Sequence, residues 1–297
     1  MKFDYIKCHG SGNEFVMVDA VKYNLEGIDL VEFARFVCNR ESAVGSDGVL
    51  LLVKQGDMYG MRMFNPDGSE AEMCGNGIRC VARLAEEYVC KREFDMLSGG
   101  NIYHITREED IIEGVPTYGV DLAVRLASGD FGFAEGAEQF VSQRIERLDA
   151  ELRWTAINVG NPHIVAEVEE IDYDHLTRLG ERVLELKAEF PKGINVSLVK
   201  VVGENEIFVA TYERGAGITA SCGTAMTSSA TAMALNGRCD YEATIDVLNR
   251  GGKVRCICHK EGALHTQLIG NASYISKGVI TAEGECFSFV CTEECNE

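Results

Sequence analysis

Two stretches decide the fold of this chain: NPDGSEAEMCGNGIRCVARLAEEY, which begins at Asn65, and YERGAGITASCGTAMTSSATAMALNG, which begins at Tyr212. Each follows an apolar segment, crosses a loop rich in glycine and charge, reaches a Cys-Gly pair and enters a helix-forming run. The second stretch matches the first at a separation of 148 positions, which places Cys222 on Cys74 and Tyr212 on Phe64. We interpret them as equivalent parts of an internal duplication.

The same separation holds outside the cysteine segments. Asn161 falls on Asn13, each preceded by glycine, and the apolar run from Val196 falls on the run from Gly48. Because each half contributes one cysteine at the start of a helix, the pattern predicts a site built between the two halves.

Composition predicts a globular chain of two domains. The chain has 297 residues, of which 46% are hydrophobic and 25% charged, enough for two domains of about 150 residues. We expect residues 1–122 to carry Cys74 and residues 123–275 to carry Cys222, with the final strand able to return to the first half. Residues 276–297 are expected to form an acidic, Cys-bearing edge strand and a mobile tail.

Net charge and hydropathy exclude several classes of partner. A net charge of -19 argues against binding to nucleic acid or anionic membranes, since both require a basic surface. The polar N-terminus lacks the apolar segment of a secretory signal, and no run of 18 apolar residues is present. We therefore expect a cytoplasmic protein whose partner is a small molecule, which can be an anion.

Twelve cysteines are expected to be reduced thiols in that compartment. The spacings nearest to a zinc site are Cys256, Cys258 and His259, and the tail cysteines Cys286, Cys291 and Cys295, but neither set forms the paired pattern that zinc prefers. Alternation indicates buried cysteines on a strand, so we predict no metal site.

Periodicity predicts two similar successions of strands and helices. GSGN before the second strand is typical of a turn and lacks the strand-to-helix context of a dinucleotide site. Helices are expected over 29–39, after Cys74, over 174–190 and after Cys222. The principal strands are expected over 3–7, 49–53, 58–64, 94–97, 102–106, 120–126, 244–247, 253–259 and 263–269.

Two thiols at helix N-termini suit inversion of an α-carbon. The helix dipole and free N–H groups lower a thiol's pKa and attract a carboxylate. With the carboxylate on both N-termini, one thiolate removes the α-proton and the opposite thiol protonates the other face. This arrangement inverts configuration without a cofactor.

Five motifs carry a family resemblance: HGSGNEFVMVD, FNPDGSEAEMCGNGIRC, NVGNPH, FPKGINV and YERGAGITASCGTA. In this order, over residues 3 to 278, they resemble diaminopimelate epimerases. The resemblance implies an α/β (α+β) fold of two pseudo-symmetric halves, each a barrel-like sheet wrapped around a central helix. It also implies an isomerase that needs no pyridoxal phosphate or other cofactor, acts as a homodimer and converts LL-2,6-diaminopimelate to meso-diaminopimelate for lysine and peptidoglycan biosynthesis.

The resemblance also assigns site residues. The catalytic pair is Cys74 and Cys222, flanked by His163 and Glu213. The reacting carboxylate is bound by Gly75, Asn76, Gly223 and Thr224, and the rest of the substrate by Asn13, Asn65, Asn161, Asn195 and Arg214. The residues alone leave other interpretations open: Asn195 could end a loop, His163 could be a core histidine, and Glu213 with Arg214 could form a surface ion pair.

Two positions depart from the usual family pattern. Ile218 replaces a glutamate that the first half keeps as Glu70, and Ala225 replaces a glycine. The change at Ile218 leaves open a cofactor-independent racemase of another amino acid, such as histidine. A non-catalytic, Cys-rich metal or redox binding protein is the alternative of another class. Exchange of the α-proton with solvent separates the enzymes from the binding protein.

Overall fold

The computed structural model describes residues 1–41, 44–126, 131–134, 136–191, 193–284, 286–295 and 297. The chain forms two compact units. Unit 1 contains Met1–Val120 and Ile269–Glu297, and unit 2 contains Asp121–Leu268. The sequence predicts a first boundary two residues later and separates 276–297 as a tail, whereas the structure groups these last residues with unit 1. No helix among the described residues is long and apolar enough to cross a membrane.

Unit 1 is a sheet-rich body with two helices. Its elements are β1 (Lys2–Gly10), β2 (Asn13–Asp19), α1 (Leu30–Cys38), β3 (Val49–Gln55), β4 (Met58–Phe64), β5 (Glu70–Ala71), α2 (Gly75–Val89), β6 (Glu93–Ser98), β7 (Asn101–Ile112), β8 (Val115–Ala123), β18 (Ser273–Glu283) and β19 (Cys286–Glu294). One boundary between the units falls within β8. This strand starts earlier than the predicted strand at 120–126 and also ends earlier, at Ala123.

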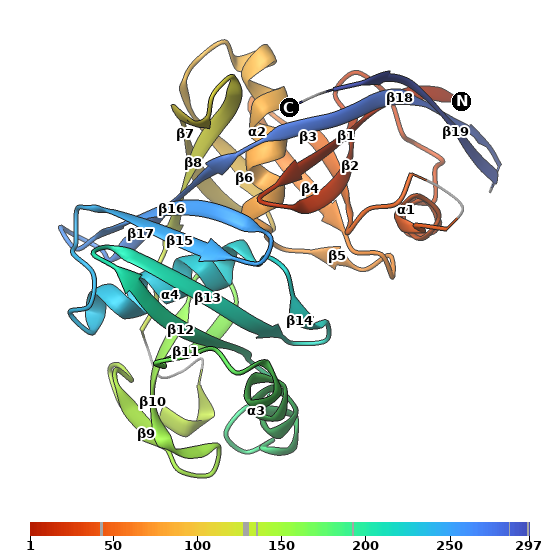
Figure 1. Ribbon diagram of the computed structural model, residues 1–297. Coiled ribbons are helices and arrows are strands. Elements are labelled where there is room, and N and C mark those ends of the chain that lie inside the picture. The colour runs from red at the N-terminus through yellow and green to blue at the C-terminus, as the bar shows by residue number, and fades with distance from the viewer. Residues whose placement is uncertain (42–43, 127–130, 135, 192, 285, 296) are drawn as a thin grey trace. The chain divides into compact units, whose positions relative to one another are not determined.

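Helix α2 lies inside unit 1 and carries the first cysteine stretch. Every residue from Gly75 to Val81 is buried, on all sides of the helix. A helix that buries its whole circumference belongs in an interior. It contacts β1, β2, β3 and β4 and is surrounded by strands of its unit (Figure 1).

Unit 2 repeats this succession. Its elements are a 3-10 turn (Gly132–Ala134), β9 (Gln143–Ile145), β10 (Asp149–Asn158), β11 (Pro162–Glu167), α3 (Tyr173–Glu185), β12 (Asn195–Gly203), β13 (Glu206–Glu213), β14 (Gly217–Thr219), α4 (Gly223–Leu235), β15 (Thr244–Asn249), β16 (Gly252–His259) and β17 (His265–Asn271), of which residues 269–271 already belong to unit 1. Asp172 caps α3 by accepting bonds from two backbone N–H groups. The helix ends at Glu185, before the predicted end at 190.

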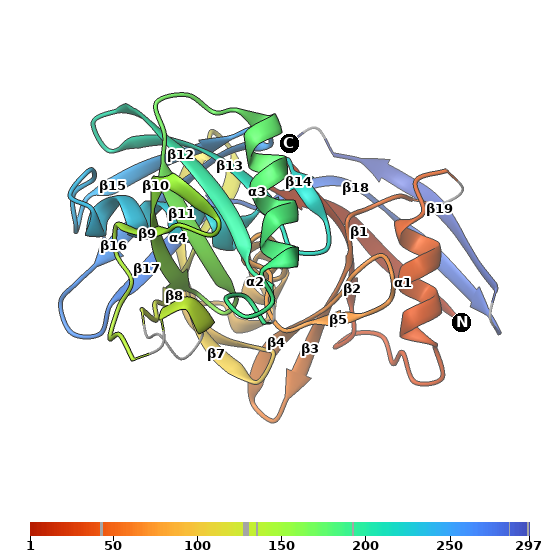
Figure 2. The same cartoon turned by 90° about the horizontal axis from the view of Figure 1, so that it is seen from below.

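Helix α4 is buried from Gly223 to Ala234 and contacts β10, β11, β12, β13, β15 and β16. Its alanine, serine and threonine side chains let the strands approach closely. Helix α3 packs on the outside of the same strands, alongside β12 and β13 (Figure 2). There Gly180 touches the ring of Tyr212 so closely that a Cβ atom would lie 2.2 Å from it.

Strand register confirms the duplication and corrects one detail of it. Phe64 pairs with Glu70 between β4 and β5, and Tyr212 pairs with Ile218 between β13 and β14, at the predicted separation of 148. In contrast, Val49 pairs with Phe64 and Val196 pairs with Tyr212. Val196 therefore corresponds to Val49, at a separation of 147 positions. The predicted match of Val196 to Gly48 is therefore wrong by one residue.

A register irregularity in β12 explains the difference. The ladder between β12 and β13 shifts between Val201 and Gly203, which inserts one residue into β12. An extra residue in one strand is a β-bulge. It restores the separation of 148 before β13 begins, so both cysteine helices start at equivalent positions.

The end of the chain completes unit 1. β18 pairs with β1 and β19 pairs with β18 as an edge strand. Phe287 of β19 packs on Phe33 of α1, with ring centroids 5.4 Å apart. At the C-terminus, the Glu297 side chain binds Arg83 through both carboxylate oxygens. The predicted edge strand is present, but the predicted mobile end is instead held by an ion pair.

Candidate functional site

Cys74 is the N-cap residue of α2. Its backbone is extended (φ -140°), and its half-buried Sγ atom accepts a bond from the Gly77 N–H at 3.4 Å. Gly77 has no room for a side chain, because a Cβ atom would lie 2.8 Å from Leu50 Cδ2. The first turn of α2 therefore presents backbone donors around the thiol, as an anion-binding helix N-terminus does.

The pKa of Cys74 moves opposite to the sequence prediction. Burial raises the pKa of this thiol to about 11, although the N–H groups of Gly77 and Asn76 and the charge of Arg79 act to lower it. A buried thiolate loses its hydration, and here that loss outweighs the helix dipole. The expectation of a lowered thiol pKa is therefore wrong for this structure.

Asn76 and Asn13 form a hydrogen-bonded chain beside Cys74. The buried Asn76 donates from Nδ2 to Asn13 Oδ1 at 3.4 Å, and Asn13 donates from Nδ2 to Asp47 Oδ2 at 2.9 Å. Asp47 also accepts bonds from the Glu14 N–H and from Arg40. The sequence analysis missed Asp47, whose only signal was its place in the GSDG turn before β3.

Asn65 lies in its own turn at the end of β4. Its backbone N–H donates to Ser69 O at 2.8 Å, and its Nδ2 atom donates to Ser69 Oγ at 3.0 Å. These bonds give Asn65 a structural role in the turn. Its predicted contact with substrate stays a prediction.

Cys222 is the N-cap residue of α4, the counterpart of Cys74. Its half-buried Sγ atom lies 3.4 Å from Thr224 Oγ1. Burial and the neighbouring Glu213 carboxylate raise the pKa of this thiol well above its ordinary value, while the Thr224 hydroxyl and the Ala225 N–H act against them. Ala225 thus keeps a backbone donor toward the sulfur despite replacing a glycine.

His163 is buried at the centre of a polar cluster in unit 2. Its Nε2 atom lies 2.9 Å from Asn161 Oδ1, 3.2 Å from Thr224 Oγ1 and 3.4 Å from Asn195 Nδ2. Burial, reinforced by the charge of Arg214, lowers the pKa of His163 to about 3. The imidazole is therefore neutral at physiological pH.

Glu213 and Arg214 end β13 at the same cluster. Glu213 accepts a bond from Thr219 Oγ1 and interacts with Cys222, and burial raises the pKa of its carboxyl group. The backbone N–H of Arg214 donates to Asn195 Oδ1 at 2.8 Å. Thr219 was not singled out from the sequence, although it follows the unusual Ile218.

Ile218 has a structural explanation. It stands opposite Tyr212 on β14, and its partly buried side chain packs against the apolar core of unit 2. Its counterpart in unit 1, Glu70, is instead exposed and paired with Arg62. The two halves use this position differently, one for packing and one for an ion pair.

The structure gathers most of the predicted residues within their own units. In unit 1 these are Cys74, Gly75, Asn76 and Asn13, and in unit 2 they are Cys222, Gly223, Thr224, His163, Asn161, Asn195, Glu213 and Arg214. In the described part of the chain, Asn65 bonds to Ser69 and Gly68 within its own turn. Among the described residues, no group of three histidine, cysteine or acidic side chains is arranged to hold a metal ion.

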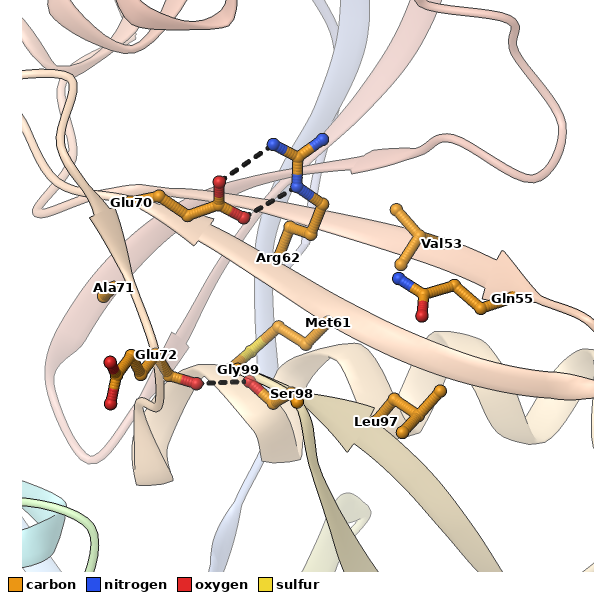
Figure 3. A pocket seen from close by; sticks show the side chains of 11 residues that line it. Val53, Gln55, Met61, Arg62, Glu70, Ala71, Glu72, Leu97, Ser98 and Gly99 are labelled. Carbon is orange, nitrogen blue, oxygen red and sulfur yellow. Dashed lines mark hydrogen bonds and ion pairs between the residues drawn. The ribbon is translucent and has the colours of Figure 1, made fainter.

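A separate pocket of about 250 Å³ lies in unit 1, beside the segment that leads to Cys74 (Figure 3). The Arg62–Glu70 pair forms two bonds at its edge, at 2.7 and 2.9 Å, and Ser98 Oγ donates to Glu72 O at 2.9 Å (Figure 3). None of the predicted site residues lines it, so it is distinct from the cysteine cluster.

Comparisons with known proteins match both cysteine stretches. The family model described as diaminopimelate epimerase matches residues 5–115 and 155–275. A diaminopimelate epimerase of Clostridium acetobutylicum is 38% identical over 287 residues, covering 94% of this chain and 86% of the relative. One from Listeria monocytogenes serotype 4a is 34% identical over 305 residues, covering 99% and 92%.

Solved structures share the fold at low identity. A phenazine biosynthesis protein of the PhzF family from Bacillus anthracis has a TM-score of 0.69 at 17% identity, covering 95% of this chain and all of that one. A hydroxyproline epimerase from Agrobacterium vitis, solved with trans-4-hydroxy-L-proline, has a TM-score of 0.62 at 14% identity, covering 98% and 92%. These likenesses confirm a mixed α/β fold of pseudo-symmetric halves.

Proposed function

We propose, because the chain belongs to the diaminopimelate epimerase family, that it interconverts LL-2,6-diaminopimelate and meso-diaminopimelate. The observation that carries the proposal is the duplicated arrangement of Cys74 and Cys222. Each caps the N-terminus of a helix buried within its unit, and the family match spans both. The product would serve lysine and peptidoglycan biosynthesis.

The proposed reaction uses the two thiols from opposite faces of one carbon. A thiolate takes the α-proton, and the electron pair of the broken C–H bond moves into the carboxylate. The opposite thiol then gives its proton to the other face of the same carbon, which inverts it. At the end the two cysteines have exchanged protonation states, so no electrons are gained or lost and the chemistry requires no cofactor.

The helix N-termini supply the electrostatic stabilisation. We propose that the backbone N–H groups at Gly75, Asn76, Gly223 and Thr224 bind the reacting carboxylate, where negative charge builds up as the α-proton leaves. One donor aimed at developing charge is worth about 3 to 4 kcal/mol in comparable sites. Exclusion of water from the bound substrate strengthens each of these bonds.

Around Cys222, two buried titratable groups act on the thiol. Burial raises the pKa of Glu213, while the bond that its carboxylate accepts from Thr219 acts to lower it. The neutral His163 holds Thr224 and Asn161 in place without adding charge. We propose that Glu213 and His163 set the protonation of Cys222 through these contacts.

The remaining polar residues fit the rest of a diamino diacid. Arg214 suits the distal carboxylate, because a guanidinium binds carboxylates through paired bonds. Asn13, Asn65, Asn161 and Asn195 offer both donors and acceptors to the amino groups and carboxylates. The homodimer and the cytoplasmic location, which follow from the resemblance and from composition, stay predictions.

A panel of amino acids tests the assignment. The wild-type protein is incubated with LL-diaminopimelate, meso-diaminopimelate, L-histidine and trans-4-hydroxy-L-proline, and configuration is followed by chiral chromatography. We expect turnover of the two diaminopimelates only, since the side chain of Ile218 packs against the apolar core of unit 2. Turnover of histidine without diaminopimelate would instead identify a racemase of the same fold. A protein that exchanges no α-proton with any substrate would be a binding protein.

A further inference from the structure

A fully buried arginine, Arg79, lies one turn into α2 behind Cys74. Its side chain is 0% exposed, which is rare for arginine unless its donors are satisfied. Nη1 donates to Gly75 O at 3.1 Å, and Nη2 donates to Asn76 Oδ1 and Ser11 Oγ, each at 3.0 Å. The guanidinium therefore joins the first turn of α2 to the turn between β1 and β2.

The backbone around Arg79 is shaped to admit it. A Cβ atom on Gly270 would lie 2.8 Å from the guanidinium carbon, and one on Gly10 would lie 2.8 Å from Asn76 O. Ser11 has a φ of 53°, in the left-handed region that residues with a side chain seldom adopt. Such a conformation persists where its surroundings hold it in place. Here it brings the Ser11 hydroxyl to the guanidinium.

Arg79 also determines which way the neighbouring amides point. Because Asn76 Oδ1 accepts a bond from Arg79, the Asn76 amide group must direct its Nδ2 donors the other way, toward Asn13. Asn13 in turn is held by Asp47 at its own Nδ2. The two amide side chains are thus oriented by the Arg79 guanidinium at one end and the Asp47 carboxylate at the other.

The duplicated half shows which part of this arrangement is general. Thr227 stands 148 positions after Arg79, and its Oγ1 donates to Gly223 O at 2.9 Å. Both helices therefore bond the carbonyl of their first residue from the same position. Arg79 also carries a positive charge, and its longer side chain bonds to Asn76 and Ser11, which a threonine could not reach.

We propose that Arg79 is a positioning residue, which holds the first turn of α2 and the Asn76 and Asn13 side chains in the orientation that binds substrate and places a positive charge behind Cys74. The inference rests on the proposed function in one respect, because it takes the first turn of α2 as the carboxylate site. Arg79 itself is shielded from substrate by the residues it orients.

The local charges agree with this role. Arg79 acts to lower the pKa of Cys74 against burial, whereas the neighbouring Cys80 on the same helix acts to raise it. On β1, burial lowers the pKa of His9, Glu14 opposes that effect and Arg79 adds to it. The charge of Arg79 thus reaches the titratable groups on both elements that it joins.

Alkylation of Cys74 tests the charge without substrate. Arg79→Met and Arg79→Lys variants are treated with iodoacetamide at pH 8, and the rates at Cys74 and Cys222 are read from separate peptides by mass spectrometry. We expect Arg79→Met to lower the alkylation rate of Cys74 about tenfold, because the thiolate loses a nearby positive charge. In Arg79→Lys the rate should stay within about threefold of wild type. An unchanged Cys74 rate in Arg79→Met, or faster reaction of both cysteines from loosened structure, would overturn the role of the charge.

Kinetics with LL-diaminopimelate test the positioning. Arg79→Lys keeps the charge but loses the planar fork, so we expect kcat to fall about 100-fold while KM changes less. Ser11→Gly, which suits the positive φ and removes only the hydroxyl, should lower kcat in the same sense by a smaller factor. This variant also serves if Arg79→Met fails to fold. A wild-type kcat in Arg79→Lys would refute the positioning.

Thr227→Val is the matched control in the second helix. It removes the equivalent bond to a first-turn carbonyl without removing charge, so we expect the alkylation rate of Cys222 to stay within about twofold of wild type. If Thr227→Val lowered the alkylation rate of Cys222 as much as Arg79→Met lowers that of Cys74, the bond to the first-turn carbonyl, and not the charge, would control thiol reactivity. Failure of wild type to epimerise diaminopimelate would reject the proposed function, while the alkylation comparison would still decide the role of Arg79's charge.

Discussion

At the scale of single residues, the two cysteines share a position but differ in their surroundings. Cys74 lies near backbone donors and the buried Arg79, whereas Cys222 lies beside the Glu213 carboxylate. Burial raises the pKa of both thiols, so each is held mainly as the neutral thiol at pH 7. The active pair needs one thiolate, and its population must increase with pH.

This protonation state predicts the pH dependence of the reaction. With a Cys74 pKa of about 11, the thiolate fraction grows tenfold for each pH unit below that value. We therefore expect kcat/KM, which reports the free enzyme, to rise about tenfold per unit between pH 6 and 8. Initial rates with LL-diaminopimelate across that range check it. A rate that levels off by pH 7 would mean that the free enzyme already holds a thiolate.

The buried His163 predicts how stability depends on pH. Its pKa is about 3 in the folded protein, against 6.5 for a histidine in water, so the unfolded chain binds more protons between these values. Folding stability therefore falls as pH is lowered from 6.5 toward 3. The contribution is about 1.4 kcal/mol per pH unit.

Urea unfolding at pH 6 and pH 5 measures this slope above the range in which most carboxylates titrate. We expect His163→Gln to reduce the loss of stability between the two pH values by about 1 kcal/mol. Equal slopes in wild type and His163→Gln would show that this histidine does not carry the effect.

Residue patterns predict the positions of the two N-cap cysteines better than the contacts around them. Cysteine before glycine at the start of a helix-forming run was enough to place Cys74 and Cys222 at N-caps. Arg79 and Asp47 could not be assigned their bonds to Ser11 and Asn13, because these bonds join segments far apart in sequence. The thiol pKa values were predicted in the wrong direction, since the depth of burial is a property of the packed molecule.

At the scale of elements, helix α1 and strand β12 show what periodicity can and cannot predict. The outer α1 begins and ends within one residue of the predicted 29–39, because its capping Asp29 and its one-sided apolar pattern are local signals. The bulge in β12 has no comparable signal. It became visible only from the pairing of Val201 and Gly203 with β13.

Packing of α3 on β13 predicts an effect of one methyl group. Gly180→Ala would place Cβ about where the Tyr212 ring lies, at 2.2 Å. Overpacking costs about 1 to 3 kcal/mol and exceeds the helix propensity that alanine gains. We expect urea unfolding to show a loss of that size. Glu181→Ala, one residue along on the exposed side of α3, should be neutral or stabilising, and a stabilised Gly180→Ala would contradict the packing.

At the scale of the whole molecule, the chain begins and ends in the same unit. β18 and β19 bring residues 273–294 back to β1, and Glu297 fixes the C-terminus on Arg83 of the central helix α2. The sequence predicted a return of the last strand but could not show where it pairs, because strand partners distant in sequence leave no local pattern.

Removal of residues 285–297 tests the structural role of the chain end. The truncation exposes Phe33, which packs on Phe287, and removes the Arg83–Glu297 ion pair. We expect a loss of about 2 kcal/mol or more in stability, seen as a lower Tm. Glu297→Gln, which removes only the charge, should cost about 1 kcal/mol or less. A truncated protein as stable as wild type would show that β19 adds no net stability.

The central claim is that two thiols act on opposite faces of one α-carbon, and isotope incorporation from solvent tests it most directly. LL-diaminopimelate is incubated with the wild-type enzyme in deuterium oxide, and product and remaining substrate are analysed at early conversion by NMR. Two exchangeable thiols predict deuterium at the inverted carbon of the product and none in the recovered substrate, with neither Cys74→Ala nor Cys222→Ala turning over. Product that keeps its original hydrogen, or full activity in either variant, would contradict the mechanism.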